Sequence, residues 1–95
     1  MIKVEQFYNK NQFRLYGDGQ NLLQSYNSLV VKVNYVDTMT ITLGRDWDYS
    51  NTTSKHVYLF LEEYANISFN GVKNKRKYVN KLIEEGKITY DSSMY

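Results

Sequence analysis

The sequence has no cysteine and no proline, and its single histidine is His56. Without cysteine there are no disulfides, thiolate zinc sites or cysteine nucleophiles, and one histidine is too few for a multi-histidine metal centre. Without proline there are no proline-rich linkers or PxxP ligands. Long apolar runs are also missing, and the first residues alternate in polarity, unlike a signal peptide. We therefore expect a cytoplasmic protein that has no membrane partner.

What is present is a short chain of ordinary globular composition. Of its 95 residues, 42% are hydrophobic and 23% are charged, which is typical of a folded, soluble domain. A chain of this length buries only about two-thirds of the surface that its unfolded form exposes. We expect a single domain over residues 1–95, with one core and no room for a deep active-site cavity beside a second domain.

The first half of the chain has the two-residue periodicity of β-strands. Apolar and polar side chains alternate over residues 29–36 and again over 38–43, and Asp37 separates the two runs as the turn of a hairpin. We expect Met39, Ile41 and Leu43 to face the core. The segment Thr38–Thr42 would then be an exposed sheet edge, which makes a homo-oligomer possible through edge-to-edge pairing.

Further hairpins are predicted upstream. Asp18-Gly19 suits the positive φ angles of a type I′ turn. Residues 25–28 interrupt the alternation and are interpreted as a bulge or tight corner between two strand segments. A strand beginning at Ile2 and Val4 would end at a turn over residues 9–11.

The pattern changes to a helical one after Gly44. Val57, Phe60, Leu61 and Tyr64 have the spacing of one helical face, and Ser50, Asn51 and Thr52 can each cap the helix start. This predicts a helix over about 52–65. A second helix over about 74–85 has Gly86 in place for its C-terminal cap, and Ile88 with Tyr90 adds a short strand or covers the core.

This order of elements predicts the fold class. Strands come first, over about residues 2–43, and two helices follow. We therefore expect an α+β domain in which an N-terminal antiparallel sheet of three to five strands carries both helices on one face.

The most distinctive segment joins the last predicted strand to the first helix. It contains the only tryptophan, a run of capping residues and the only histidine. In a functional interpretation it forms a small polar site at a helix N-terminus, which favours an anion. In the structural interpretation, which we favour, Trp47 fills the seam between sheet and helix. The residues of this motif are Trp47, Asp48, Tyr49, Ser50, Thr52, Thr53, Lys55 and His56.

The same segment allows one catalytic hypothesis. Asp46 and Asp48 are two residues apart, so on an extended segment their carboxylates would point the same way, and His56 follows. A small metal-dependent hydrolase is therefore a remote alternative. No third ligand stands at a motif spacing, and no calcium loop is present. We expect no enzymatic activity, no metal and no cofactor.

Charge is concentrated in one part of the chain. Residues 72–87 carry six basic and two acidic side chains, whereas the net charge of the whole chain is only +2. An anionic partner such as nucleic acid would bind there. The alternative is a solvated helix face with Lys81–Glu85 pairing. The candidate binding residues are Lys73, Lys75, Arg76, Lys77 and Lys81.

Three short segments carry a family resemblance. Residues 25–29 (S-Y-N-S-L), residues 47–56 (W-D-Y-S-x-T-T-x-K-H) and Phe60-Leu61 together resemble a pattern found in small uncharacterised proteins of bacteriophages and other mobile elements. These occur chiefly in low-GC Gram-positive bacteria. The resemblance implies a phage or mobile-element accessory protein in a bacterial cytoplasm, and it implies no particular chemistry.

The leading functional hypothesis is a non-enzymatic binding protein with a host or phage protein as its partner. An inhibitor of host defence, of the anti-CRISPR or anti-restriction type, is its specific form. Ten tyrosines are compatible with a protein-binding face, because tyrosine is enriched at interfaces. The alternative is a nucleic-acid-binding accessory protein that uses residues 73–81.

Overall fold

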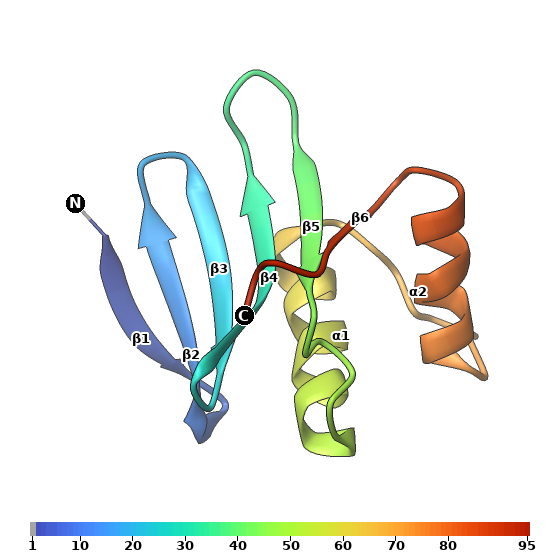
Figure 1. Ribbon diagram of the computed structural model, residues 1–95, viewed down its shortest axis with the longest axis horizontal. Coiled ribbons are helices and arrows are strands. Elements are labelled where there is room, and N and C mark those ends of the chain that lie inside the picture. The colour runs from blue at the N-terminus through green and yellow to red at the C-terminus, as the bar shows by residue number, and fades with distance from the viewer. Residues whose placement is uncertain (1) are drawn as a thin grey trace.

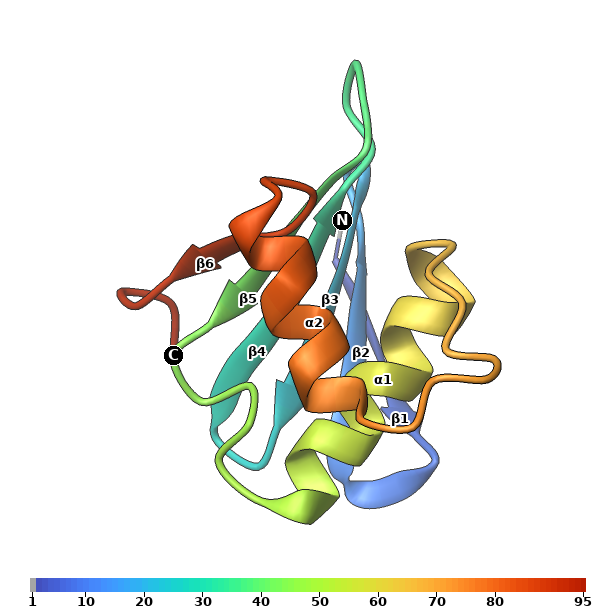
Figure 2. The same cartoon turned by 90° about the vertical axis from the view of Figure 1, so that its right-hand side faces the viewer.

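The sheet and the two helices form an α+β fold, as the sequence predicts. A computed structural model describes residues 2–95. Five antiparallel strands are followed by two helices and a last strand, which pairs with its neighbour in parallel. Both helices lie on one face of the twisted sheet (Figures 1 and 2). The elements are β1 (Lys3–Phe7), β2 (Asn9–Gly17), β3 (Gln20–Ser25), β4 (Ser28–Asn34), β5 (Thr40–Gly44), α1 (Asn51–Tyr64), α2 (Lys75–Glu84) and β6 (Thr89–Asp91).

The six strands lie in the order of the sequence, from β1 at one edge to β6 at the other. This is one strand more than the upper limit predicted, because Thr89–Asp91 adds to β5 at Thr42–Gly44. The expected exposed edge at Thr38–Thr42 is therefore wrong in its C-terminal part, which β6 covers. The free edges of the sheet belong to β1 and to the three-residue β6.

Turn chemistry explains which hairpins the sequence located. Asp18 and Gly19 have φ angles of +50° and +78°, as a type I′ turn requires. The turn predicted over residues 9–11 is wrong, since the chain reverses at Tyr8 and those residues begin β2. Tyr8 adopts a positive φ of +64°, and its phenol donates a hydrogen bond to Glu63 of α1. The turn at Tyr8 thus involves a contact with a helix that is distant in the sequence. The residues around Tyr8 do not predict this contact.

Residues 25–28 form a hairpin turn between β3 and β4. Tyr26, at a φ of +55°, and Asn27 are the two residues between the paired strands. The tight corner was predicted, and the irregularity in strand register lies earlier, between Leu23 and Gln24.

Both helices begin at a side-chain cap, of which the sequence predicted the one at the first helix. The Ser50 side chain accepts a hydrogen bond from the backbone N–H of Thr53 at 3.1 Å, and Asn74 does the same for Lys77 at 3.0 Å. Gly86 follows α2 with a φ of +77°. The predicted bounds are therefore correct to within one residue at each helix end.

The core lies between the sheet and the helices. Ile41 and Leu43 face it as predicted, but Met39 is 39% exposed. The prediction that Met39 faces the core is therefore wrong. Met39 belongs to the β4–β5 loop, which extends beyond both helices (Figure 1). The buried hydrophobic residues are Phe7, Leu23, Val30, Val31, Val33, Ile41, Leu43, Trp47, Val57, Phe60, Leu61, Ala65, Phe69, Val79, Leu82 and Ile88.

Gly44 marks the crowded point where β5 ends. A Cβ atom there would lie 2.5 Å from the Leu29 carbonyl oxygen and 2.6 Å from that of Met94, distances that no side chain tolerates. The next residue, Arg45, donates its N–H to the same Met94 oxygen at 2.9 Å. The chain beyond β6 therefore packs onto the end of β5. Among residues 2–95 no helix is long and apolar enough to cross a lipid bilayer.

Trp47 provides the first test. It is 3% exposed, and its ring meets Tyr58 of α1 edge-on, with 6.4 Å between ring centroids. We expect Trp47→Ala to lower the free energy of unfolding by about 3–5 kcal/mol, because it leaves a large cavity in the core. Denaturant titration followed by circular dichroism measures this decrease.

Tyr49 is the matched control, because it lies two residues away and is 81% exposed. Tyr49→Ala should change the free energy of unfolding by no more than about 0.5 kcal/mol. A native fluorescence emission maximum near that of free tryptophan would contradict the burial of Trp47.

Candidate functional site

Two hollows flank the first turn of α1. One is a shallow groove of about 680 Å³ between the start of α1 and the start of α2. The other is a smaller pocket of about 190 Å³ between the same turn of α1 and the β3–β4 turn. We call them the basic groove and the hydroxyl pocket. The groove is lined by Asn51, Ser54, Lys55, Tyr58, Lys73, Asn74, Lys75 and Arg76.

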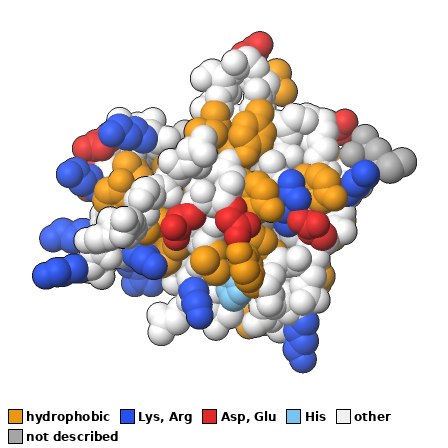
Figure 3. Space-filling model, turned by 180° about the vertical axis from the view of Figure 1, so that it is seen from behind, with side chains coloured by type: hydrophobic (Ala, Val, Ile, Leu, Met, Phe, Trp, Pro, Cys, Tyr) orange, Lys and Arg blue, Asp and Glu red, His pale blue; other side chains and the backbone are white. Residues whose placement is uncertain are grey.

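Four cationic side chains converge on the basic groove. Lys55 comes from α1, Lys73 from the segment between the helices, and Lys75 and Arg76 from the first turn of α2. Seen from the helix side, many basic side chains lie at the end of the molecule where α2 lies, and other charged side chains of both signs are spread over the rest of this face (Figure 3). The groove therefore attracts anions.

The charges at the start of α2 conflict with the helix dipole. Lys75, Arg76 and Lys77 occupy its first turn, which contains no acidic residue. Cations are unfavourable at a helix N-terminus, where backbone N–H groups create partial positive charge. One acidic neighbour offsets part of this cost, since Asp48 Oδ2 lies 3.7 Å from Arg76 Nε and the Asp48 carbonyl accepts from Arg76 Nη2 at 3.3 Å. A bound anion would offset more.

Tyr58 forms the aromatic part of the groove. The Lys75 ammonium lies 5.8 Å from its ring centroid, within the range of a cation–π interaction. Burial raises the pKa of the Tyr58 phenol, while the hydrogen bond with Ser54 and the charge of Arg76 act in the opposite direction. Tyr58 is therefore neutral at pH 7 and adds no negative charge to the groove.

The structure divides the basic residues that the sequence proposed. Lys73, Lys75 and Arg76 line the groove, whereas Lys77 and Lys81 are not among its lining residues. Lys55 joins the cluster, although the sequence placed it only in the motif. One signal could have found it: Asn51, Lys55 and Tyr58 follow the spacing of a single helical face. That face lies beside the start of α2 only in the folded structure, so the sequence alone does not show this packing.

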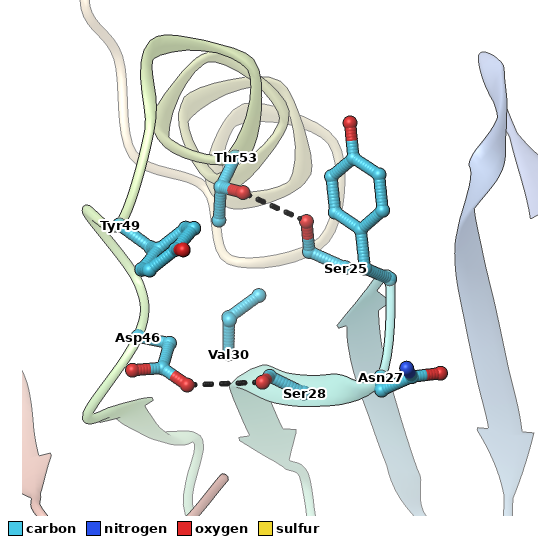
Figure 4. Close-up of a pocket in the computed structure, with 8 residues that line it drawn as sticks. Ser25, Asn27, Ser28, Val30, Asp46, Tyr49 and Thr53 are labelled. Carbon is cyan, nitrogen blue, oxygen red and sulfur yellow. Dashed lines mark hydrogen bonds between the residues drawn. The ribbon is translucent and has the colours of Figure 1, made fainter.

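The hydroxyl pocket is framed by two hydrogen bonds (Figure 4). The hydroxyl groups of Ser25 and Thr53 lie 2.9 Å apart, and Ser28 donates to Asp46 Oδ2 at 3.0 Å. Val30 lies between these pairs, and Tyr49 stands on the α1 side. The complete lining is Ser25, Tyr26, Asn27, Ser28, Val30, Asp46, Tyr49 and Thr53.

The pocket brings together two of the segments that carry the resemblance. Residues 25–28 supply one side, and Tyr49 and Thr53 supply the other. Residues 29 and 47, at the facing ends of these segments, are 18 positions apart, so the sequence alone did not place them together. Of the other motif residues, Trp47 is buried and Ser50 caps α1, Lys55 lines the groove, and Thr52 is exposed and lines neither hollow.

The residues of the catalytic hypothesis contact different parts of the structure. The chain from Arg45 to Ser50 is a series of turns and is not extended as the hypothesis assumed. Asp46 bonds to Ser28 of β4, and Asp48 pairs with Arg76 of α2. His56 is 6% exposed, with Nδ1 at 2.7 Å from the Thr52 carbonyl oxygen. Within residues 2–95, no group of three or more histidine, aspartate or glutamate side chains could hold a metal ion.

The buried Ser25–Thr53 bond gives the second test. We expect Thr53→Val to lower the free energy of unfolding by about 1–3 kcal/mol, because Ser25, 3% exposed, loses its partner while staying buried and the Ser50 hydroxyl loses an acceptor at 3.1 Å. The double variant Ser25→Ala/Thr53→Val should cost less than the sum of the single changes. Denaturant unfolding of the four proteins measures the coupling.

Thr52→Val is the control for this cycle, since Thr52 is exposed. The same chemical change there should alter the free energy of unfolding by at most about 0.5 kcal/mol. Equal effects at positions 52 and 53 would show that the buried bond does not stabilise the fold.

Comparison with known proteins places the chain in a family. No curated protein and no solved structure matches it. One family model matches residues 2–81, a range that contains β1 to β5, α1, the residues lining both hollows and the first part of α2. Because this match covers most of the sequence, the chain belongs to DUF8033, a family of unknown function.

Proposed function

We propose that this chain is a non-enzymatic binding protein whose ligand is a nucleic acid held by its phosphates in the basic groove. The convergence of Lys55, Lys73, Lys75 and Arg76 on one concave surface carries this proposal. Phosphate contacts from lysine and arginine supply most of the affinity of proteins for nucleic acid. The groove thus favours the nucleic-acid hypothesis over the protein partner that the sequence placed first.

The ends of both helices support a phosphate ligand. Asn51 is the first residue of α1 and Asn74 is the cap of α2, and both line the groove. The N-terminal ends of two helices therefore meet at one surface, and each favours negative charge. The cations in the first turn of α2 destabilise the free protein and stabilise a bound anion.

The shape of the groove favours a polymer over a single phosphate. Its cations are spread across two helices and the segment between them, in a shallow space of about 680 Å³. A strand of successive phosphates can contact cations that come from separate elements of the fold. As the biological setting we propose an accessory protein of a phage or mobile element in a bacterial cytoplasm, in keeping with the resemblance of residues 25–29 and 47–56. Interference with a host defence system is a role that such a protein could serve by binding nucleic acid.

The groove residues are tested by a charge-matched pair of variants. We expect Lys55→Gln/Lys73→Gln/Lys75→Gln to weaken binding of labelled oligonucleotides. The slope of log affinity against log salt should flatten by about one for each phosphate that the variant no longer neutralises. Fluorescence anisotropy at several salt concentrations measures both quantities.

The control is Lys77→Gln/Lys81→Gln/Lys87→Gln, which removes the same charge from side chains that do not line the groove. Its affinity and salt slope should remain close to those of the unmodified protein. An equal decrease in affinity for both variants would indicate a general effect of net charge. An unmodified protein that fails to bind at low salt would refute the proposed function.

A single substitution tests the conflict between stability and binding. Lys75→Glu places an acidic side chain in the first turn of α2, where the helix dipole favours it. We expect the free energy of unfolding at low salt to rise by about 0.3–1 kcal/mol, while nucleic-acid affinity falls. If the lysine is only part of a solvated face, stability would rise and affinity would stay unchanged.

A further inference from the structure

The hydroxyl pocket lies close to the groove, on the other flank of the same helical turn. Thr53 lines the pocket and Lys55 lines the groove. Two residues along an α-helix are separated by about 200° around its axis, so the two hollows face away from each other across the start of α1. Asn51 and Thr52, at the top of this turn, are exposed. A flexible chain that occupies both hollows must therefore bend around this exposed turn.

The pocket has a different chemistry from the groove. Its lining includes no lysine or arginine in the described part of the chain, and it contains the carboxylate of Asp46. A phosphate would be repelled there. Ser28 and Asp46 offer a hydroxyl group and a carboxylate, and the exposed ring of Tyr49 offers apolar surface, whereas Ser25, Thr53 and Val30 form the buried floor. This combination suits a neutral, planar group that carries N–H donors.

Asp46 retains the capacity to accept hydrogen bonds from such a group. Oδ2 accepts from Ser28 at 3.0 Å, and Oδ1 lies 3.5 Å from Arg45 Nε. A carboxylate can accept about four hydrogen bonds, so sites remain for a ligand. Carboxylates accept from the exocyclic amino group of a base such as cytosine.

Two tyrosines at the pocket are unusually placed. Tyr49 is 81% exposed, more than any other large hydrophobic side chain in residues 2–95. Tyr26 is 49% exposed and occupies a turn position with a φ of +55°, which is uncommon for a residue other than glycine or asparagine. Exposed aromatic rings beside a cationic surface are the elements on which bases of single strands stack.

The size of the pocket limits its ligand. About 190 Å³ is less than the roughly 300–1,000 Å³ of sites for drug-sized molecules, and it suits one heterocycle. A base inside a duplex has both faces stacked and its pairing edge occupied, so it cannot enter. An unpaired base in a single strand has its ring faces and its pairing edge available for contact.

From these observations we infer that the hydroxyl pocket binds one unpaired, amino-bearing base of a single-stranded nucleic acid whose phosphates lie in the basic groove. The part concerning phosphates rests on the proposed function, and the part concerning the base does not. Tyr49 stacks on the base, and Asp46 accepts from its amino group.

Free nucleosides test the pocket alone, because they carry no phosphate. We expect cytidine, followed by ¹H–¹⁵N NMR, to shift the backbone amides of Asn27, Tyr49 and Thr53, and thymidine to shift them less. The absence of shifts at these residues with cytidine, adenosine and guanosine would overturn the inference. Shifts with nucleosides in a protein that binds no oligonucleotide would support the pocket and refute only the proposed function.

Oligonucleotide binding tests the link between pocket and groove. Tyr49→Ala should weaken binding of a cytosine-rich single strand by roughly 5- to 150-fold, the range for removal of one stacking interaction. It should leave the salt slope and any duplex binding unchanged, and Tyr49→Phe should retain the affinity. Asp46→Asn, which keeps an acceptor for Ser28, should reduce the preference for cytosine over thymine.

Tyr90→Ala is the control, because Tyr90 is 45% exposed and lies outside the pocket. It should leave single-strand affinity unchanged. Equal affinity of Tyr49→Ala and the unmodified protein for single strands would overturn the inference. So would shifts at the pocket with an arginine-containing peptide and none with nucleosides, since these would assign the pocket to a protein side chain.

Discussion

A hydrogen bond between two buried hydroxyl groups, those of Ser25 in β3 and Thr53 in α1, joins the start of α1 to the sheet on which its apolar face packs. Thr53 also donates its backbone N–H to Ser50, the residue that begins the helix. Thr53 therefore contributes both to the N-terminal cap of α1 and to the contact between α1 and the sheet. Both hollows are built on this turn, so a displaced α1 would change the groove and the pocket together.

The two hollows separate charge in a way that suits a nucleotide strand. Cations gather where the starts of two helices meet, and a carboxylate with hydroxyl groups lies across the turn. Phosphates and bases differ in the same respect: the former are anionic and the latter neutral. The unfavourable placement of Lys75, Arg76 and Lys77 at a helix N-terminus is what we expect where binding, and not folding, determines the sequence.

Local patterns predicted the local features of the fold. Both helices were located to within one residue, because helix-end residues such as Ser50 and Gly86 act through neighbouring backbone groups. The Tyr8 turn and the covered edge of β5 were missed, since each involves residues more than forty positions away. The site was found in part: three of its four cations follow from the charge run, whereas Lys55 and the pocket require the packing of distant segments.

The parallel strand β6 has a consequence for how the chain folds during synthesis. Strands β1 to β5 are joined in sequence by short connections, so their pairing involves contacts that are local along the chain and form early. The outer edge of β5 receives its partner only after both helices and residues 89–91 have been made. Until then a half-finished molecule exposes unpaired backbone groups beside an apolar strand, which is a template for aggregation. The last strand thus protects only the completed chain, and the nascent chain is open to self-association until residues 89–91 have been made.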